Sequence, residues 1–251
     1  MSFISAIYFG LLQGLTEFLP VSSSGHLLLF RSLFAPYDSP LLLDIVLHTG
    51  SLLAILWFFK EVIFDKKGIK KLIMPLFVGT LPAILVGLLV YQRFQGIFST
   101  PRLLGFSFLI TSLFLALFSS IPWGKITLTK VPSLNAFIVG LFQALAIMPG
   151  ISRSGSTIFA GRLQKFNQKT AFAFAFLLAV PAILGSLVLS LKDGLVLGTV
   201  NALPVLVGFL ASFVSSLFAL KLLQILLRKK NLMLFSVYTF LLGCFCLGVF
   251  L

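Results

Sequence analysis

The sequence predicts an all-α membrane protein that crosses the bilayer several times, and two observations lead to this class. First, 59% of the 251 residues are hydrophobic, only 10% are charged, and the mean hydropathy is +1.13. Second, long runs contain no Asp, Glu, Lys or Arg, and a helix needs roughly 20 apolar residues to cross a hydrocarbon core of about 30 Å. These runs are 72–91, 103–124, 170–191, 194–220 and 231–251. Short strands of alternating polarity, typical of an outer-membrane barrel, are absent.

The first half begins with a helix-like apolar stretch over 3–19. The sequence PVSSSGH at 20–26, here called the first polar segment, interrupts it, and an apolar stretch over 27–34 follows. Three apolar runs then predict membrane-spanning helices over about 41–60, 72–92 and 103–122.

The second half has the same order of elements. An apolar stretch over 133–148 leads into PGISRSGST at 149–157, the second polar segment, and an apolar stretch over 158–163 follows. Three further spans are expected at 170–191, 201–220 and 232–251.

Each polar segment predicts a helix-loop-helix that enters the bilayer and returns to the same side, because the apolar stretches around it are short. Irregular backbone at membrane depth is tolerated only where it lines a cavity or is buried in protein. The two polar segments are therefore expected to form an internal site.

The two halves are related as an internal repeat in a single membrane domain, with repeat 1 at about 1–122 and repeat 2 at about 131–251. At an offset of 130, QGLTEFLPVSSSG (13–25) aligns with QALAIMPGISRSG (143–155), and five of the thirteen positions are identical. The identical pairs are Gln13/Gln143, Leu15/Leu145, Ser22/Ser152, Ser24/Ser154 and Gly25/Gly155. The match includes the polar residues of both copies.

A returning helix pair plus three spans gives an odd number of crossings, so the second half is expected to insert upside down relative to the first. The distribution of basic residues supports this arrangement. Of nineteen Lys and Arg residues, fourteen fall on the side opposite the N-terminus, only Arg31, Arg93, Arg102 and Lys192 fall on the N-terminal side, and Arg153 lies in the second polar segment. Because cytoplasmic loops are enriched in Lys and Arg, we expect the opposite side to be cytoplasmic and both termini to lie outside. The fourteen are Lys60, Lys66, Lys67, Lys70, Lys71, Lys125, Lys130, Arg162, Lys165, Lys169, Lys221, Arg228, Lys229 and Lys230.

Three other classes of feature are disfavoured. The net charge of +13 is spread over loops between spans rather than one face, which argues against nucleic acid. Cys244 and Cys246 lie inside the last apolar run and predict neither a disulfide nor a zinc site. The first residues lack a basic region and a cleavage site, so no removable signal peptide is expected.

Two charged residues lie at membrane depth. Of the six acidic residues, Asp38, Glu61, Asp65 and Asp193 fall near the ends of spans, whereas Glu17 ends the first apolar stretch. Burying a charge there costs at least about 2.5 kcal/mol, which marks a functional candidate. The same argument applies to Arg153 in the second polar segment. Direct pairing of Glu17 with Arg153 is one interpretation, but it leaves the surrounding serines unexplained.

The second polar segment has the composition of an anion site. Glycines and serines at a helix break expose backbone N–H groups, and the following helix directs its positive end towards the gap. The guanidinium of Arg153 matches phosphate oxygens in bidentate geometry.

A histidine and two side chains that could bind a metal ion complete the predicted site. His26 follows three serines and suggests general acid/base chemistry, although a lone histidine is often only a packed core residue. Gln13 and Glu17 are spaced i, i+4, so their oxygens face one side of a helix and suit a divalent cation, Mg²⁺ or Ca²⁺. Asp44 and His48 share that spacing and predict either support of the site or internal pairing. A phosphate clamp, a hydroxyl nucleophile and an imidazole inside a membrane indicate a lipid phosphate or diphosphate as substrate.

QGLTEFLPVSSSGH and PGISRSGST resemble the two signature segments of the undecaprenyl-diphosphate phosphatase family, also called bacitracin-resistance proteins. The resemblance extends over nearly the whole chain, including LDIVLHTGSLLAIL and FLLAVPAILG. It implies hydrolysis of undecaprenyl diphosphate to the monophosphate and inorganic phosphate, which recycles the carrier lipid for peptidoglycan synthesis and confers bacitracin resistance. It also implies a bacterial plasma-membrane enzyme that depends on a divalent cation and opens towards the outer face.

The resemblance assigns roles residue by residue. Glu17 matches an acidic position of the motif, Ser23 the proposed nucleophile and His26 the catalytic histidine. Gln13 stands where many members carry a glutamate, so the cation site has one charge fewer. The remaining matches form the phosphate-binding set, with Arg153 counted as both binding and catalytic: Ser22, Ser24, Gly25, Ser152, Arg153, Ser154, Gly155 and Thr157.

Two points stay open at this stage. Ser23, His26 and an activated water all fit the spacing as the group that attacks phosphorus. A lipid-phosphate flippase or anion transporter built on the same inverted repeat is the rival function, because fold alone does not fix function. The sequence leaves the oligomeric state and the preferred tail length open.

Overall fold

The computed structural model describes residues 2–33, 41–91, 100–192, 202–229 and 231–250. Within these ranges the chain is helical apart from turns, extended connections and an isolated bridge between Ile126 and Phe166, so the predicted all-α class is confirmed. Asp38, Arg93, Asp193 and Lys230 lie outside the described residues.

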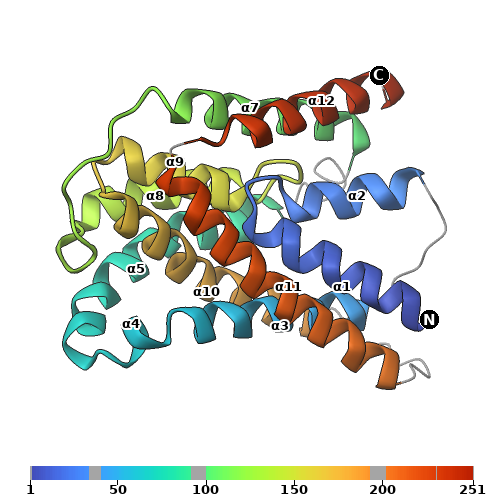
Figure 1. Cartoon of the computed structure of the whole chain (residues 1–251), viewed down its shortest axis with the longest axis horizontal. Coiled ribbons are helices and arrows are strands. Elements are labelled where there is room, and N and C mark those ends of the chain that lie inside the picture. The colour runs from blue at the N-terminus through green and yellow to red at the C-terminus, as the bar shows by residue number, and fades with distance from the viewer. Residues whose placement is uncertain (1, 34–40, 92–99, 193–201, 230, 251) are drawn as a thin grey trace.

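The helices follow the predicted order in both halves (Figure 1). The first half contains α1 (Phe3–Phe18), α2 (Ser23–Leu33), α3 (Leu41–Phe58), α4 (Lys60–Phe64), α5 (Lys66–Val86), the π-helical turn η1 (Gly87–Tyr91) and α7 (Pro101–Phe118). The second half contains the 3₁₀ turn η2 (Leu128–Lys130), α8 (Ser133–Leu145), α9 (Arg153–Leu163), α10 (Gln168–Lys192), α11 (Ala202–Arg228) and α12 (Met233–Phe250).

Local sequence explains where several helices begin. Ser2 caps α1 by accepting a hydrogen bond from the Ser5 amide, and Asp65 caps α5 by accepting one from Lys67. The Asn167 side chain does the same for Thr170 at the start of α10 over 2.8 Å. Side-chain acceptors at these positions satisfy amides that have no partner within the helix. Pro101 occupies the first turn of α7, where its missing N–H costs nothing.

Among the described residues, five helices are long and apolar enough to cross a membrane: 66–89, 101–118, 168–190, 202–228 and 233–250. Five of the six predicted spans correspond to these helices, and for the first the described apolar stretch is Leu43–Phe58 of α3. Large apolar side chains such as Leu134 and Leu234 point outwards, 70% and 76% exposed. Exposed apolar surface on this scale marks a membrane-facing protein.

The span predicted at 201–220 is longer than expected. α11 continues to Arg228, through Lys221, because Leu220, Leu223 and Leu227 remain fully buried against the core. The sequence analysis ended this span at the first charge, whereas burial on one helix face carries it further.

The first helix of each half packs against the second-last span of the other half: α1 lies on α11, and α8 lies on α5. Glycines form both crossings. A Cβ on Gly10 would collide with the carbonyl of Gly208, and a Cβ on Gly140 would collide with that of Gly79. Gly10 and Gly140 are related by the same offset of 130 that aligns the polar segments.

The last spans of the two halves, α7 and α12, pack against each other through paired contacts. The Ser112 hydroxyl donates to the carbonyl of Ser236 over 2.8 Å, and the Ser236 hydroxyl donates to that of Ser112 over 2.9 Å. Gly105 and Gly243 also lie close together. Gly105 is seven residues before Ser112, and Gly243 is seven residues after Ser236. These contacts are those expected of two halves related by a two-fold axis. Their opposite insertion in a bilayer stays a prediction.

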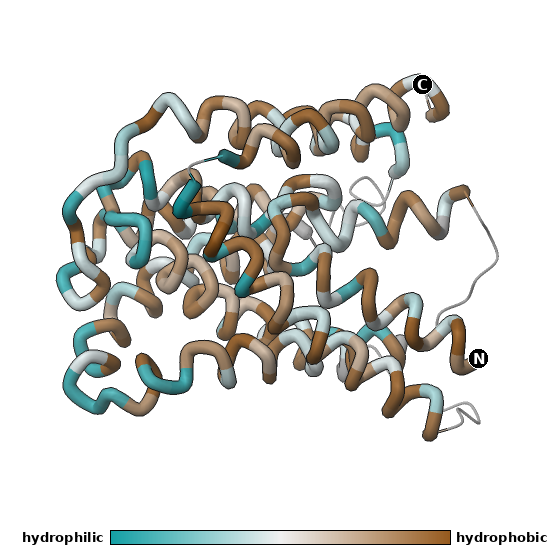
Figure 2. The backbone as a smooth tube through the Cα atoms, in the orientation of Figure 1, coloured by the Kyte–Doolittle hydropathy of each residue, from teal (hydrophilic) through white to brown (hydrophobic). Residues whose placement is uncertain are grey.

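The polar connections gather at one end of the molecule. Figure 1 places the α3–α5, α7–α8 and α9–α10 connections at the left end and both termini at the right end. Figure 2 shows that hydrophilic residues are concentrated at this left end, with hydrophobic tube along the long helices.

Arg162 is one of the fourteen basic residues counted on the side opposite the N-terminus. It lies in the last turn of α9, and its side chain is 1% exposed. Its guanidinium lies 4.3 Å from the ring centre of Phe118 and 4.5 Å from that of Trp123. The aromatic faces hold this cation in the protein interior.

Candidate functional site

Each polar segment is a sharp turn between two short helices. α1 ends at Phe18, and Ser22 turns the chain with a φ of 68° before α2 begins at Ser23. α8 ends at Leu145, and Gly150, with a φ of 95°, turns the chain before α9 begins. A positive φ is rare for residues with a side chain, which makes the Ser22 turn the more constrained of the two.

The two segments use equivalent serines as helix caps. The Ser22 hydroxyl accepts a hydrogen bond from the Gly25 amide over 3.3 Å, and the Ser152 hydroxyl accepts one from Gly155 over 3.1 Å. Ser24 and Ser154 contact these caps at 3.4 Å and 3.2 Å. The predicted phosphate-binding serines Ser22 and Ser152 therefore begin the helices on which the site is built.

The Ser22 hydroxyl also joins the two halves, because it accepts a second hydrogen bond from the Gly150 amide over 3.1 Å. Beside it, a Cβ on Gly25 would lie 2.8 Å from the Cα of Gly150. In the equivalent contact, a Cβ on Gly155 would lie 3.3 Å from the Cβ of Pro20. The turns are thus in direct backbone contact, and the N-termini of α2 and α9 both begin at this junction.

Thr111 of α7 supports the second turn and was not predicted from the sequence. Its hydroxyl donates to the carbonyl of Gly150 over 2.8 Å and accepts from the amide of Ser152 over 2.9 Å. A single threonine within a charge-free run gives no pattern by which to find it.

Glu17 is the centre of the polar contacts. One carboxylate oxygen pairs with the guanidinium of Arg153. The other accepts hydrogen bonds from the side-chain amide of Gln13 over 3.0 Å and the hydroxyl of Ser23 over 2.6 Å, and lies 4.0 Å from Nε2 of His48. The structure therefore brings together Gln13, Glu17, Ser23 and Arg153, as the sequence analysis expected.

His48 faces this carboxylate, while its other nitrogen, Nδ1, lies 2.8 Å from the backbone oxygen of Asp44. This contact is to the Asp44 backbone, so pairing of the two side chains stays a prediction. The position of His48 suits support of Glu17.

Burial separates the predicted residues into two groups. Glu17, Gln13, Ser154 and Thr157 are at most 7% exposed. The Thr157 hydroxyl donates to the backbone oxygen of Arg153 over 2.8 Å, so it stabilises the first turn of α9. Ser23 and Arg153 are partly exposed and Ser24 is exposed, so these side chains are open to a ligand.

His26 has partners of its own. Its Nδ1 lies 2.7 Å from the backbone oxygen of Ser22 and its Nε2 lies 2.7 Å from the hydroxyl of Tyr238. The structure thus places this histidine in the first polar segment without a described hydrogen bond to Ser23, which is bonded to Glu17 instead.

The predicted cation site can be tested on its donor atoms. Within the described ranges, no three His, Cys, Asp or Glu side chains cluster in a way that could hold a metal ion. However, the side-chain oxygen of Gln13 is buried without a hydrogen-bond partner while its nitrogen bonds Glu17. Mg²⁺ commonly takes one or two protein oxygens and completes its shell with water and substrate phosphates. Gln13 and Glu17 fit such a site.

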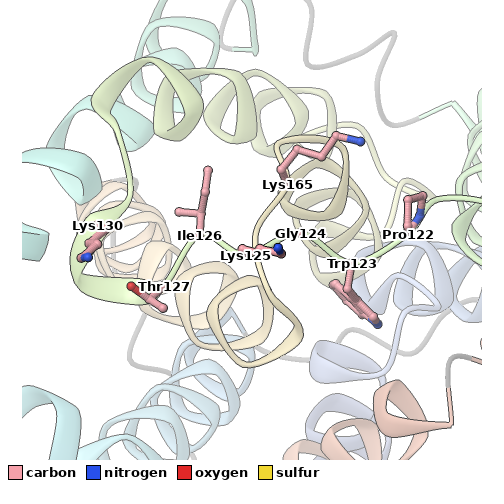
Figure 3. A pocket seen from close by; sticks show the side chains of 8 residues that line it. All are labelled: Pro122, Trp123, Gly124, Lys125, Ile126, Thr127, Lys130 and Lys165. Atoms are coloured by element: carbon pink, nitrogen blue, oxygen red, sulfur yellow. The ribbon is translucent and has the colours of Figure 1, made fainter.

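A surface pocket of about 680 Å³ lies elsewhere, at the lysine-rich end of the molecule (Figure 3). Its wall is formed by Pro122, Trp123, Gly124, Lys125, Ile126, Thr127, Lys130 and Lys165. None of these belongs to the polar segments, so this pocket is separate from the site around Glu17.

Comparison with known proteins gives a consistent result over the full length. A family model described as "Bacitracin resistance protein BacA" matches residues 6–245. The chain is 41% identical over 249 residues to the undecaprenyl-diphosphatase of Carboxydothermus hydrogenoformans, covering 97% of this chain and 95% of the relative. It is 38% identical to the undecaprenyl-diphosphatase of Halothermothrix orenii, with 97% and 96% covered. It is 37% identical to that of Methanobrevibacter smithii, with the same coverage.

Proposed function

Because the chain belongs to the bacitracin resistance protein BacA family, we propose that it is an undecaprenyl-diphosphatase. It hydrolyses undecaprenyl diphosphate to undecaprenyl phosphate and inorganic phosphate. Recycling of this carrier lipid supports peptidoglycan synthesis and gives resistance to bacitracin. The function is supported by the names of the relatives and by the chemistry of the site.

The observation that carries the proposal is the contact between Arg153 and Glu17 at the junction of two helix N-termini. Without substrate, the guanidinium is neutralised by a carboxylate. A diphosphate offers the same bidentate acceptor geometry with more charge, so it competes with Glu17 for Arg153. The amides at the starts of α2 and α9 add further positive potential.

The lipid nature of the substrate follows from the position of the site. Glu17 ends a short apolar helix and is surrounded by helices whose outer faces are apolar. A polyprenyl tail can remain in the bilayer while its diphosphate reaches the polar segments.

A divalent cation, Mg²⁺ or Ca²⁺, would be held by Gln13 and Glu17 and would offset the charge of the diphosphate. Arg153, which pairs with the Glu17 carboxylate oxygen that Gln13 does not contact, offsets the same charge. Its release from Glu17 on substrate binding would leave a carboxylate oxygen available.

In the first step, the Ser23 oxygen attacks the terminal phosphorus. The 2.6 Å hydrogen bond from Ser23 to Glu17 makes that carboxylate the acceptor of the hydroxyl proton. The bond between the terminal phosphorus and the bridging oxygen breaks, and undecaprenyl phosphate leaves with the bonding electrons. Arg153 and the helix N-termini stabilise the charge that develops on the phosphoryl oxygens.

In the second step, water attacks the phosphoserine and gives a proton to Nε2 of His26. The bond between phosphorus and the serine oxygen breaks, inorganic phosphate leaves, and Ser23 recovers its proton from Glu17. Direct attack by water on the diphosphate is the alternative, and transient labelling of Ser23 by radioactive phosphate distinguishes the two.

The chain is a multi-pass membrane protein. We further propose that it lies in the bacterial plasma membrane with both termini and the active-site opening on the outer face. The basic connections at one end and the termini at the other support this orientation (Figure 1).

The test is release of inorganic phosphate from a C55 isoprenyl diphosphate by the purified protein in detergent, with and without a chelator. We expect release that stops on chelation and returns when Mg²⁺ or Ca²⁺ is added. Absence of release in detergent, together with sided lipid movement in vesicles, would instead identify the transporter.

A further inference from the structure

His26 is held by a residue from the opposite end of the chain. Its Nε2 lies 2.7 Å from the hydroxyl of Tyr238, which is 212 residues away in α12. Neither the sequence motifs nor the proposed steps assign a role to this tyrosine. Tyr238 therefore contributes an atom from the second half to a histidine of the first half.

The hydrogen bonds determine which nitrogen of His26 carries the proton. Nδ1 lies 2.7 Å from the backbone oxygen of Ser22, and a carbonyl oxygen only accepts. Nδ1 therefore carries a hydrogen, and the lone pair of the neutral ring is on Nε2. The hydroxyl of Tyr238 donates to that lone pair.

Ring packing fixes the orientation of His26 as well. The ring of Phe108 stands edge-on, with centroids 5.6 Å apart and an angle of 83°. The ring of Tyr238 is nearly parallel to the imidazole, at 12° with centroids 5.7 Å apart. Loss of the tyrosine hydroxyl alone would keep this packing and remove only the hydrogen bond.

We propose that Tyr238 is a positioning residue that holds Nε2 of His26 towards the reaction and passes to it the proton of the attacking water. The proposal rests on the undecaprenyl-diphosphatase function. When the water attacks, the Tyr238 hydroxyl gives its proton to the Nε2 lone pair while its oxygen takes the proton of the water, and the imidazolium N–H then donates a hydrogen bond to the Tyr238 oxygen. The tyrosine exchanges one proton for another, so no proton is gained or lost there.

The first experiment compares Tyr238→Phe with Tyr8→Phe by steady-state kinetics of phosphate release. Both changes remove one hydroxyl from a half-exposed tyrosine on an apolar helix. We expect kcat of Tyr238→Phe to fall by about tenfold or more, the typical loss when a hydrogen bond to a charged group is removed. KM should stay within about twofold for a residue that does not bind substrate, and Tyr8→Phe should keep the kinetics of the unchanged protein.

A double-mutant cycle separates this role from simple packing. In a His26→Ala background, Tyr238→Phe should change the remaining kcat by less than about twofold, because residues that act as a unit are not additive. An equal loss in both backgrounds would overturn the proposal.

A second measurement needs no turnover. The chain has two histidines, so nitrogen NMR of protein labelled in histidine, with His26→Ala for assignment, resolves the ring of His26. We expect neutral His26 to carry its proton on Nδ1, and its Nε2 resonance to move in Tyr238→Phe but not in Tyr8→Phe. A proton on Nε2, or no movement, contradicts the pairing. Absence of phosphate release by the unchanged protein would contradict the enzymatic function. The NMR measurement would still test the hydrogen bond between His26 and Tyr238.

Discussion

The backbones of Gly25 and Gly150 touch: a methyl group on Gly25 would lie 2.8 Å from the Cα of Gly150. Real Cβ atoms essentially never approach other atoms this closely, so a side chain at position 25 would have to push the two turns apart. It brings the turn of one half onto the turn of the other, beside the hydrogen bond from the Gly150 amide to Ser22.

Gly25→Ala should therefore separate the polar segments. We expect a loss of about 1–3 kcal/mol in stability, typical of overpacking, and loss of phosphate release, because Arg153 would move away from Glu17. The matched control is Gly248→Ala in α12, where a Cβ would have no atom within 4 Å. Thermal unfolding in detergent and phosphate release of both variants test this. If Gly25→Ala keeps the midpoint and activity of the control, the junction is not tightly packed.

Arg153→Lys should lose most of the activity even though the charge is kept. A lysine cannot grip two phosphate oxygens in one plane, and removing a preorganised donor typically costs 10²-fold or more in kcat, or roughly 2.7 kcal/mol. The loss is expected in kcat rather than KM, and Ser154→Ala should cost visibly less because its hydroxyl is one neutral donor among several. Steady-state kinetics on purified, folded variants measure this. Near-normal kcat for Arg153→Lys would reduce the arginine to a counter-ion of Glu17.

Glu17→Gln should abolish metal-dependent turnover, whereas Gln13→Glu should be tolerated at saturating metal. The second change sets a carboxylate against Glu17, where an amide nitrogen now lies 3.0 Å from the carboxylate oxygen. A cation between them relieves that repulsion, so we expect a lower concentration of Mg²⁺ or Ca²⁺ for half-maximal rate. Rates across a metal titration give the answer. Unchanged rates of Glu17→Gln at limiting metal would remove the metal role.

Both termini should be reachable from outside the cell. The prediction rests on fourteen basic residues on one side against four on the other. Cysteine placed at position 2 or after residue 250, in a background with Cys244 and Cys246 replaced, should react with an impermeant reagent in intact cells. Protection of both sites until the cells are opened would reverse the topology.

The sequence was informative where the chemistry is local. Composition predicts the helix breaks at 20–26 and 149–157. The helical period predicts the contact between Gln13 and Glu17, which are one turn apart on the same helix. The offset of 130 found in the polar segments reappears in Gly10 and Gly140 at the two equivalent helix crossings.

Contacts between residues that are distant in the sequence could not be predicted from the sequence. Thr111 and Tyr238 are single polar residues in apolar runs, and only the packing of α7 and α12 beside the turns gives them partners. The sequence gives Arg162 only as one more basic residue, yet its guanidinium lies over the rings of Phe118 and Trp123. Such residues are identified by neighbours that are distant in sequence.

The pairing of Glu17 with Arg153 has a consequence for biosynthesis. The two residues are 136 positions apart, so the ribosome adds most of the first half and the start of the second before the carboxylate can meet its arginine. α1 also waits for α11, its main packing partner, which is made later still. The candidate site is therefore assembled late, after spans of both halves have been made. An amino-terminal fragment released early would carry Glu17 without the arginine that neutralises it.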